Sequence, residues 1–339
     1  MKRWFINGLL TLLLVGGTAI AQEQPPDTML AVQIQRFGGP EVLTVHEIAT
    51  PVPADGELLV RVEAAGVNPV DTGARSGRAA ALTAAEPPYI PGFDISGEVV
   101  ATGPGVSGFD IGDAVYAMLD LRRGGGYAQY TLVKQSEVAD RPANLTHQEA
   151  ASLPLVALTA WQALFDTADL QAGETVLIQG GAGGVGSIAV QLAKWRGARV
   201  IATASDYNQA FLQELGVDVP VDYRNQRFED FATDVDVVLD TVGGDTQVRS
   251  LSVLRPGGIL VSLVGLTSEA QNPPPGTRAV AILVRSDGEQ LSQIGQLLET
   301  EILRPVVSYR FDFSAAPEAH RQSETRRTRG KIVLVPDAD

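Results

Sequence analysis

TVLIQGGAGGVGSIAVQLAKWR, the stretch from residue 175 to residue 196, decides the fold of this 339-residue chain. An apolar run is followed by glycines in the spacing Gly-x-Gly-x-x-Gly and then, from residue 187, by a segment with helical periodicity. In such a strand–turn–helix unit the first glycine permits a tight turn, the second lets the backbone approach a pyrophosphate, and the third lets the helix pack on the strand. The helix amino end also attracts phosphate. We therefore predict a dinucleotide-binding turn formed by Gly181, Ala182, Gly183, Gly184, Val185 and Gly186.

Strands and helices alternate around this turn. Near-continuous apolar runs predict strands at residues 175–179, 199–204, 219–222, 235–241 and 258–264. Residues 148–168 read as a helix interrupted at Pro154, and helices at 187–196 and 208–215 join the first three strands. Strand, helix and strand repeated in this way predict a doubly wound parallel sheet, buried on both faces and closed by right-handed crossovers.

The regions before and after this sheet have a different pattern. Short apolar runs at 58–62, 95–100 and 114–118 are separated by Gly and Pro, which predicts a small, mostly β lobe. The tail contains a helix at 289–298 and a strand at 332–335, and we expect it to complete the β-rich lobe. The expected fold class is therefore α/β with two lobes.

The end of the second predicted strand indicates which dinucleotide binds. NAD sites usually carry Asp or Glu there to hold the ribose 2′-OH, whereas this strand ends in Ala204 and Ser205. A 2′-phosphate can then enter, which favours NADPH as the cofactor. Asp206, two positions beyond the expected acid, leaves NADH open as the alternative. The expected donors to the phosphate are Ser205, Asn208 and Tyr223, with Arg224 as a nearby cation.

Composition excludes several other classes of protein. The chain is 45% apolar and 19% charged, as a globular protein is, and its length suits two domains. Its net charge is −14, and it becomes −16 without Lys2 and Arg3, the only charges in residues 1–21, so nucleic acid is excluded as a partner. There are no cysteines, which excludes disulfides, cysteine nucleophiles and thiolate metal sites.

The first residues predict export. A basic start, an apolar stretch from Leu9 to Ile20 and the small residues Ala19 and Ala21 form a signal peptide at 1–21, followed by a linker at 22–28. The expected location is the periplasm or the exterior, with no stable membrane anchor after cleavage. An uncleaved anchor is one alternative, although the apolar run is short for a span. Translation from Met29 is another, and it would place the protein in the cytoplasm.

Several motifs resemble the medium-chain dehydrogenase/reductase superfamily, and within it the zinc-independent quinone oxidoreductase-like branch. The resemblance runs from residue 29 to residue 336 and includes the glycine turn. Its other motifs are AGVNPVD at 65–71, PGFDISG at 91–97, LTAW at 158–161, DTVGG at 240–244 and RGKIVL at 329–334.

This resemblance implies a particular domain organisation. We expect a GroES-like catalytic domain at 29–147, a Rossmann dinucleotide-binding domain at 148–285, and a segment at 286–339 that completes the catalytic domain. It also implies a cleft between the lobes and a homodimer. Asn68 is expected to orient the acceptor oxygen, although it can also be an ordinary turn residue. Thr159 is expected on the nicotinamide side, with Val242, Val264 and Gly330 also at the cofactor.

The zinc ligands of related alcohol dehydrogenases are missing. Where those enzymes carry a Cys, this chain has Asn68-Pro69-Val70-Asp71, and where they carry a His-Glu pair it has Phe93-Asp94. We expect the dispersed histidines, His46, His147 and His320, to be surface or loop residues, and we predict no metal site.

Hydride transfer without a metal needs an acceptor that is already electrophilic. The predicted reaction is therefore reduction of a quinone or an α,β-unsaturated carbonyl compound by NADPH. Related reductases often carry Tyr where this chain has Gly73, so the substrate side is expected to be wider. The alternative hypothesis is an exported NADPH-binding sensor or interaction protein of the same fold without turnover.

Overall fold

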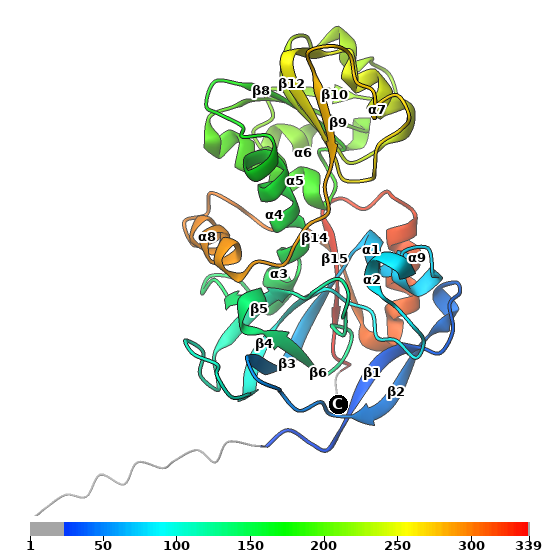
Figure 1. Ribbon diagram of the computed structural model, residues 1–339, viewed down its shortest axis with the longest axis vertical. Helices are drawn as coiled ribbons and strands as arrows, with labels where there is room; N and C mark the ends of the chain where they lie inside the picture. Colours follow the sequence, from blue (N-terminus) through cyan, green and yellow to red (C-terminus); the bar gives the residue numbers. More distant parts are fainter. Residues whose placement is uncertain (1–23, 338–339) are drawn as a thin grey trace, which may run out of the picture.

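The computed structural model describes residues 24–337, which form two lobes, one above the other in Figure 1. The upper lobe is a six-stranded sheet of order β10-β9-β8-β11-β12-β13 in which every neighbouring pair is parallel. Its strands are β8 (Thr175–Gln179), β9 (Arg199–Ala204), β10 (Val219–Asp222), β11 (Val235–Asp240), β12 (Leu254–Ser262) and β13 (Arg278–Ala281). The helices between them are α5 (Gly184–Arg196), α6 (Gln209–Glu214) and α7 (Gly244–Leu251).

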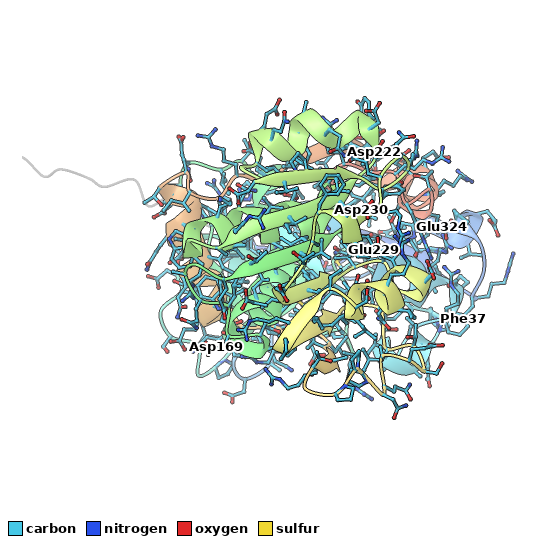
Figure 2. All side chains as sticks on the ribbon, turned by 90° about the horizontal axis from the view of Figure 1, so that it is seen from above. Phe37, Asp169, Asp222, Glu229, Asp230 and Glu324 are labelled. Carbon is cyan, nitrogen blue, oxygen red and sulfur yellow. The ribbon has the colours of Figure 1, made fainter. Side chains whose placement is uncertain are left out.

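The strand order places the glycine turn where a ligand is expected. The chain runs outward from β8 through β9 to β10 and then returns to place β11 on the other side of β8. Ligands of open α/β sheets bind outside the carboxyl ends of the strands at such a reversal. In Figure 2 this carboxyl edge lies on the side of Asp222, opposite Asp169, which precedes β8.

Alternate residues of the sheet pack into two different cores. Val176 and Ile178 of β8 belong to the large core shared with the lower lobe, whereas Leu177 belongs to the core on the other face. All three side chains are fully buried. Burial of each contributes roughly 1.5–3 kcal/mol, which explains why the sequence here reads as a continuous apolar run.

The lower lobe is a seven-stranded sheet of order β14-β15-β3-β4-β5-β7, with β6 also paired to β3. Its strands are β3 (Glu57–Val67), β4 (Asp94–Thr102), β5 (Ala114–Met118), β6 (Tyr130–Lys134), β7 (Val138–Asp140), β14 (Val307–Asp312) and β15 (Lys331–Val335). A separate antiparallel pair is β1 (Thr28–Ile34) and β2 (Leu43–Ala49). Because β15 pairs with β3, the end of the chain lies in a sheet built mainly by residues 57–140.

Helices cover this sheet and connect it to the upper lobe. They are α1 (Pro69–Ser76), α2 (Ala80–Thr83), α3 (His147–Ala151), α4 (Pro154–Trp161), α8 (Gly288–Glu299) and α9 (Ala316–Glu324). A π-helical turn, η3 (Gln162–Thr167), extends α4. In Figure 1, α1, α2 and α9 lie together on one side of the lower lobe, where α1 packs against α9.

Local sequence patterns were sufficient to predict several of these elements. β8, β9 and β10 have the predicted bounds, and the helix predicted at 148–168 is divided at Pro154, which begins α4. Proline is tolerated there because the first turn of a helix needs no N–H partner. β12 begins four residues before the predicted strand. The domain boundaries stay a prediction.

The prediction for the amino terminus falls on residues that the structure does not describe. The signal peptide at 1–21 and the first two linker residues lie outside residues 24–337. Within the described range, no helix combines the length and apolar character needed to cross a membrane.

The prediction that all three histidines are surface or loop residues is wrong for His320. This residue lies on α9 with no exposed surface, and its ring stands edge-on to Tyr127, with Nε2 3.3 Å from the tyrosine hydroxyl. Burial, aided by the charge of Arg75, lowers the pKa of His320 to about 3. The histidine is therefore neutral in the folded protein at neutral pH.

We expect His320 to make the fold sensitive to acid. The histidine binds a proton near its ordinary pKa only in the unfolded chain, so its contribution to stability is present above pH 6.5 and is lost as pH falls toward 3. Between pH 7.5 and pH 5 this loss is about 2 kcal/mol. In His320→Gln, the decrease in the free energy of unfolding between pH 7.5 and pH 5 should be smaller than in the wild type by this amount. Urea denaturation at the two pH values measures it. His46→Gln is the matched control, and its stability should change with pH as that of the wild type does. An equal pH dependence of stability in all three proteins would contradict the role given to His320.

Candidate cofactor and active site

The glycine turn has three packed positions and one open one. A Cβ atom at Gly186 would lie 2.2 Å from the Gly180 carbonyl oxygen, and one at Gly181 would lie 2.9 Å from the Ala202 side chain. At Gly184 it would meet the Lys331 side chain at 3.0 Å. At Gly183, by contrast, a Cβ would have one atom within 4 Å among residues 24–337 beyond its chain neighbours, the Gly180 carbonyl oxygen at 3.4 Å. The second glycine of the motif is therefore the place where a ligand can approach the backbone, which fits a pyrophosphate.

The start of α5 adds favourable electrostatics to this turn. Gly183 is the N-cap, so Gly184, Val185 and Gly186 form the first turn of the 13-residue helix. The N–H groups of a first helical turn have no partner within the helix, and the dipole there favours an anion. The first turn carries no acidic side chain.

The residues expected at the 2′-phosphate are brought together beyond the end of β9. Ser205 precedes the turn η4 (Asp206–Asn208), the Asn208 amide donates to the Ser205 hydroxyl at 3.3 Å, and the N–H of Tyr223 donates to the Ala204 carbonyl at 3.1 Å. Arg224 lies beside the exposed ring of Tyr223, 5.8 Å from its centre.

A cation that the sequence analysis missed, Arg329, lies in the same place. Its Nε donates to Asn208 Oδ1 at 2.8 Å, and its guanidinium lies 4.8 Å from the ring centres of both Tyr207 and Phe211. Arg329 is 121 residues from Asn208 in sequence, so only the fold reveals this contact. Asp206 lies on the exposed side of the same turn.

Two further loops at the carboxyl edge are held by a buried network. Asp240 accepts hydrogen bonds from the N–H groups of Val242 and Gly243 and from the side chains of Gln247 and Ser262. The network leaves Val242 52% exposed and Val264 55% exposed. Both valines are therefore accessible at the edge where the cofactor is expected.

The two lobes meet directly at the glycine turn. Gly330, just before β15, forms a parallel bridge with Gly183, and its N–H donates to the Ala182 carbonyl at 2.9 Å. Thr159 of α4 is buried, and its hydroxyl donates to the Leu155 carbonyl at 2.6 Å within its own helix. This hydrogen bond engages the Thr159 hydroxyl in the helix, so the proposed contact with the nicotinamide stays a prediction.

Asn68 belongs to a buried polar cluster between the lobes. Its side-chain Nδ2 donates to Asp94 Oδ2 at 2.8 Å, and its Oδ1 accepts from the Lys331 ammonium group. Asp94 also accepts from the backbone N–H of Leu155 at 2.7 Å, so β4 and α4 are joined here. Only 1% of Asn68 is exposed. Asn68 could be predicted from the sequence, whereas Lys331 as its partner could not, and Asp94 was noted only because Phe93-Asp94 stand where related alcohol dehydrogenases have zinc ligands.

Asp71, the third residue of α1, lies beside this cluster and accepts two backbone hydrogen bonds there. One carboxylate oxygen accepts from the Asn68 N–H at 2.7 Å and the other from the Gly92 N–H at 3.0 Å. Burial raises the pKa of Asp71 to about 7 and raises that of Asp94, while burial lowers the pKa of Lys331. Desolvation dominates each shift, as expected when charged groups lie away from water. These two contacts make Asp71 a structural partner of the turn that carries Asn68.

Comparisons with known proteins agree with this architecture. The family model described as "Alcohol dehydrogenase GroES-like domain" matches residues 54–143, and the one described as "Zinc-binding dehydrogenase" matches residues 215–334. The 2-methylene-furan-3-one reductase of Solanum lycopersicum is 36% identical over 92% of this chain and 80% of its own length. The chloroplastic NADPH-dependent alkenal/one oxidoreductase of Arabidopsis thaliana is 35% identical, with the same two shares.

A solved structure matches both lobes as well. The quinone oxidoreductase from Coxiella burnetii has a TM-score of 0.85 and 36% identity, with 91% of this chain and all of that chain covered. The fold, the glycine turn and these similarities together place the chain among oxidoreductases with a GroES-like and a Rossmann-type domain. The chain belongs to the medium-chain dehydrogenase/reductase superfamily, in its quinone oxidoreductase-like branch.

Proposed function

We propose that this protein is a zinc-independent oxidoreductase that transfers a hydride from NADPH to a quinone or an α,β-unsaturated carbonyl compound. The observation that carries the proposal is the open face of Gly183, which lies beside Gly330 and next to the Asn68 cluster. A turn suited to a cofactor phosphate and a polar group suited to a carbonyl oxygen lie at the same junction, which supports the proposal.

In this proposal, some residues of the chain bind the cofactor and another binds the acceptor. Gly181 to Gly186 would hold the pyrophosphate, and Val242 and Val264 would pack against the cofactor at the carboxyl edge. The bound NADPH supplies the hydride. Asn68 would donate a hydrogen bond to the acceptor oxygen, where negative charge develops as the hydride reaches the β-carbon of an enone. A solvent proton at the α-carbon then completes the saturated ketone.

The choice of NADPH rests on the charges at the end of β9. Ala204 supplies no carboxylate at the position that grips a ribose 2′-OH in NAD sites, and Arg329, Asn208 and Ser205 offer donors to a 2′-phosphate. In a chain of net charge −14, a local cation is needed to offset the repulsion of phosphate. The Arabidopsis relative is named for its NADPH dependence, which supports the same choice.

The proposal of zinc independence rests on the donors present. No cysteine occurs anywhere in the chain, and Phe93, which occupies a position of the usual zinc ligands, has no donor atom. Among residues 24–337, no three or more His, Asp or Glu side chains are grouped so that they could hold a metal ion. Without a Lewis acid to stabilise alkoxide, a conjugated acceptor is the better substrate. Two relatives are named for such compounds, a 2-methylene-furan-3-one and alkenals or alkenones.

The proposed reaction is tested by NADPH oxidation with a panel of quinones and enones. We expect turnover with NADPH that survives dialysis against a chelator, and a kcat/KM at least about tenfold higher with NADPH than with NADH, as one charge-assisted contact to the 2′-phosphate provides. Activity that is lost on chelation and restored by zinc would contradict the metal-free mechanism. Tight NADPH binding without turnover of any acceptor would instead support the sensor hypothesis.

We also propose a homodimer and an exported location. β13 is an edge strand of the parallel sheet, with Val280 36% exposed and Leu283, just beyond it, 58% exposed, so a second sheet edge could pair with it. Light scattering that gives the mass of a monomer would contradict the dimer.

For location, a native amino terminus at Gln22 would support export, and one at Met29 would support the cytoplasm.

A further inference from the structure

Lys331 is a buried lysine that has no role in the reaction proposed above. It is the first residue of β15, and its side chain is only 6% exposed. Its ammonium group donates to the Val67 carbonyl at 2.8 Å and to Asn68 Oδ1, and it lies 3.6 Å from Asp94 Oδ2. Removing an ammonium group from water is unfavourable unless such partners offset the lost hydration.

The partners of Asn68 determine which way its amide points. An ammonium group can only donate, so Lys331 must face the carbonyl oxygen of the amide, and the Asp94 carboxylate accepts from Nδ2. The reversed amide would place its NH₂ against the ammonium group and its oxygen against the carboxylate. One Nδ2 hydrogen is used by Asp94, and within residues 24–337 no second protein acceptor of Nδ2 is found. The remaining hydrogen is the one that Asn68 can offer to a ligand oxygen.

The same lysine also contacts the cofactor-binding turn. Its neighbour Gly330 donates to the Ala182 carbonyl and forms a bridge with Gly183. Its own Cδ lies so close to Gly184 that a Cβ added there would approach it to 3.0 Å. The stem of Lys331 therefore packs against the glycine turn while its ammonium group holds Asn68.

We propose that Lys331 is a positioning residue that fixes Asn68 with an amide N–H available to the acceptor oxygen and joins this orientation to the cofactor-binding turn. This role rests on the proposed function, because it concerns how the acceptor is polarised during hydride transfer. Lys331 does not itself touch the acceptor; it acts through Asn68.

A double-mutant cycle in the full-length protein tests this role. Asn68→Ala should lower kcat about 100-fold for an enone, as loss of one oxyanion donor does. Lys331→Met keeps the stem but removes the donor, and it should lower kcat at least about tenfold while the Kd for NADPH changes less than about twofold. The double variant should be no more than about twofold slower than Asn68→Ala alone, because both changes remove the same hydrogen bond to the acceptor. Lys134→Met, at an exposed surface ion pair, is the matched control and should keep wild-type activity.

Loss of Lys331 alone leaves the Asp94 carboxylate buried without its cation, so a second comparison uses a background in which residue 94 is neutral. Lys331→Met added to Asp94→Asn removes the donor without leaving that charge, and kcat should fall relative to Asp94→Asn alone. Multiplicative losses in the cycle with Asn68→Ala would overturn the proposal, since Lys331 would then act independently of Asn68. Unchanged kcat in Lys331→Met would also overturn it.

A readout without catalysis separates this proposal from the proposed function. Absence of turnover in the wild-type protein would refute the proposed function. The shifts in melting temperature for Lys331→Met, Asn68→Ala and the double variant would still test the contact. Positioning predicts that the double variant melts well above the value expected from adding the two single shifts. Additive shifts would overturn it.

Discussion

Gly183→Ala is expected to weaken NADPH binding about 100-fold while the protein stays folded. The backbone at Gly183 is extended, with φ of −77°, and within the described part of the chain an added Cβ meets one atom beyond its chain neighbours, at 3.4 Å. The methyl group would instead occupy the space that the pyrophosphate needs, at a cost of about 2–3 kcal/mol. Quenching of protein fluorescence by NADPH measures the Kd, and thermal denaturation measures the fold.

Gly186→Ala is the matched comparison at the third glycine. Here a Cβ would lie 2.2 Å from the Gly180 carbonyl oxygen and 2.8 Å from the Gly181 Cα, so backbone has to move. We expect the free energy of unfolding to fall by about 3 kcal/mol. The two alanines should thus separate ligand approach from helix packing. If Gly183→Ala bound NADPH as the wild type does, the turn would not hold the pyrophosphate at this residue.

Arg329→Gln is expected to remove most of the preference for NADPH over NADH. The guanidinium is oriented by Asn208 and by the rings of Tyr207 and Phe211, next to the end of β9. A charge-assisted hydrogen bond to a phosphate contributes about 1.5–3 kcal/mol, so the Kd for NADPH should rise roughly 10–100-fold. The Kd for NADH should change less than about twofold, because NADH has no 2′-phosphate.

Two other arginines make this comparison specific. Arg224→Gln removes the cation that the sequence analysis favoured, and it should have a smaller effect because its guanidinium lies beside Tyr223 rather than over Asn208. Arg321→Gln, on the exposed side of α9, should have none. Equal losses of NADPH and NADH affinity in Arg329→Gln would show that this arginine supports the fold of the site and does not recognise the phosphate.

The parallel-sheet lobe could be predicted from sequence because its signals are local. The signals for the strand, the turn and the helix all lie within the 22 residues from 175 to 196. β13 and α7 were not predicted, because β13 is a largely exposed edge strand and α7 is largely polar. Chain length and the change of pattern along the chain supplied the expectation of two lobes. The family resemblance supplied their GroES-like and Rossmann types, and the matched family models and the solved structure confirm that fold class.

The site was predicted only in part, because its decisive contacts are long-range. Asn68 and Lys331 are 263 residues apart, and the two residues meet only once β15 has paired with β3. Arg329 reaches Asn208 for the same reason, since both contacts depend on the return of the last strand to the junction of the lobes. Periodicity and motif spacing contain no information about such pairings. His320 was assigned to the surface for a related reason: its ring packs against Tyr127, 193 residues earlier in the chain, and is buried there.

Hydride delivery from NADPH to a conjugated acceptor without a metal is the proposed reaction on which the roles of these residues depend. The most direct test is single turnover of chelator-treated protein with NADPH deuterated at C4 of the nicotinamide and an α,β-unsaturated ketone, followed by mass and NMR analysis of the product. We predict that deuterium from one face of the nicotinamide appears at the β-carbon, and that the α-carbon takes its hydrogen from solvent. Deuterium at the carbonyl carbon, or a product free of deuterium, would contradict the proposed mechanism.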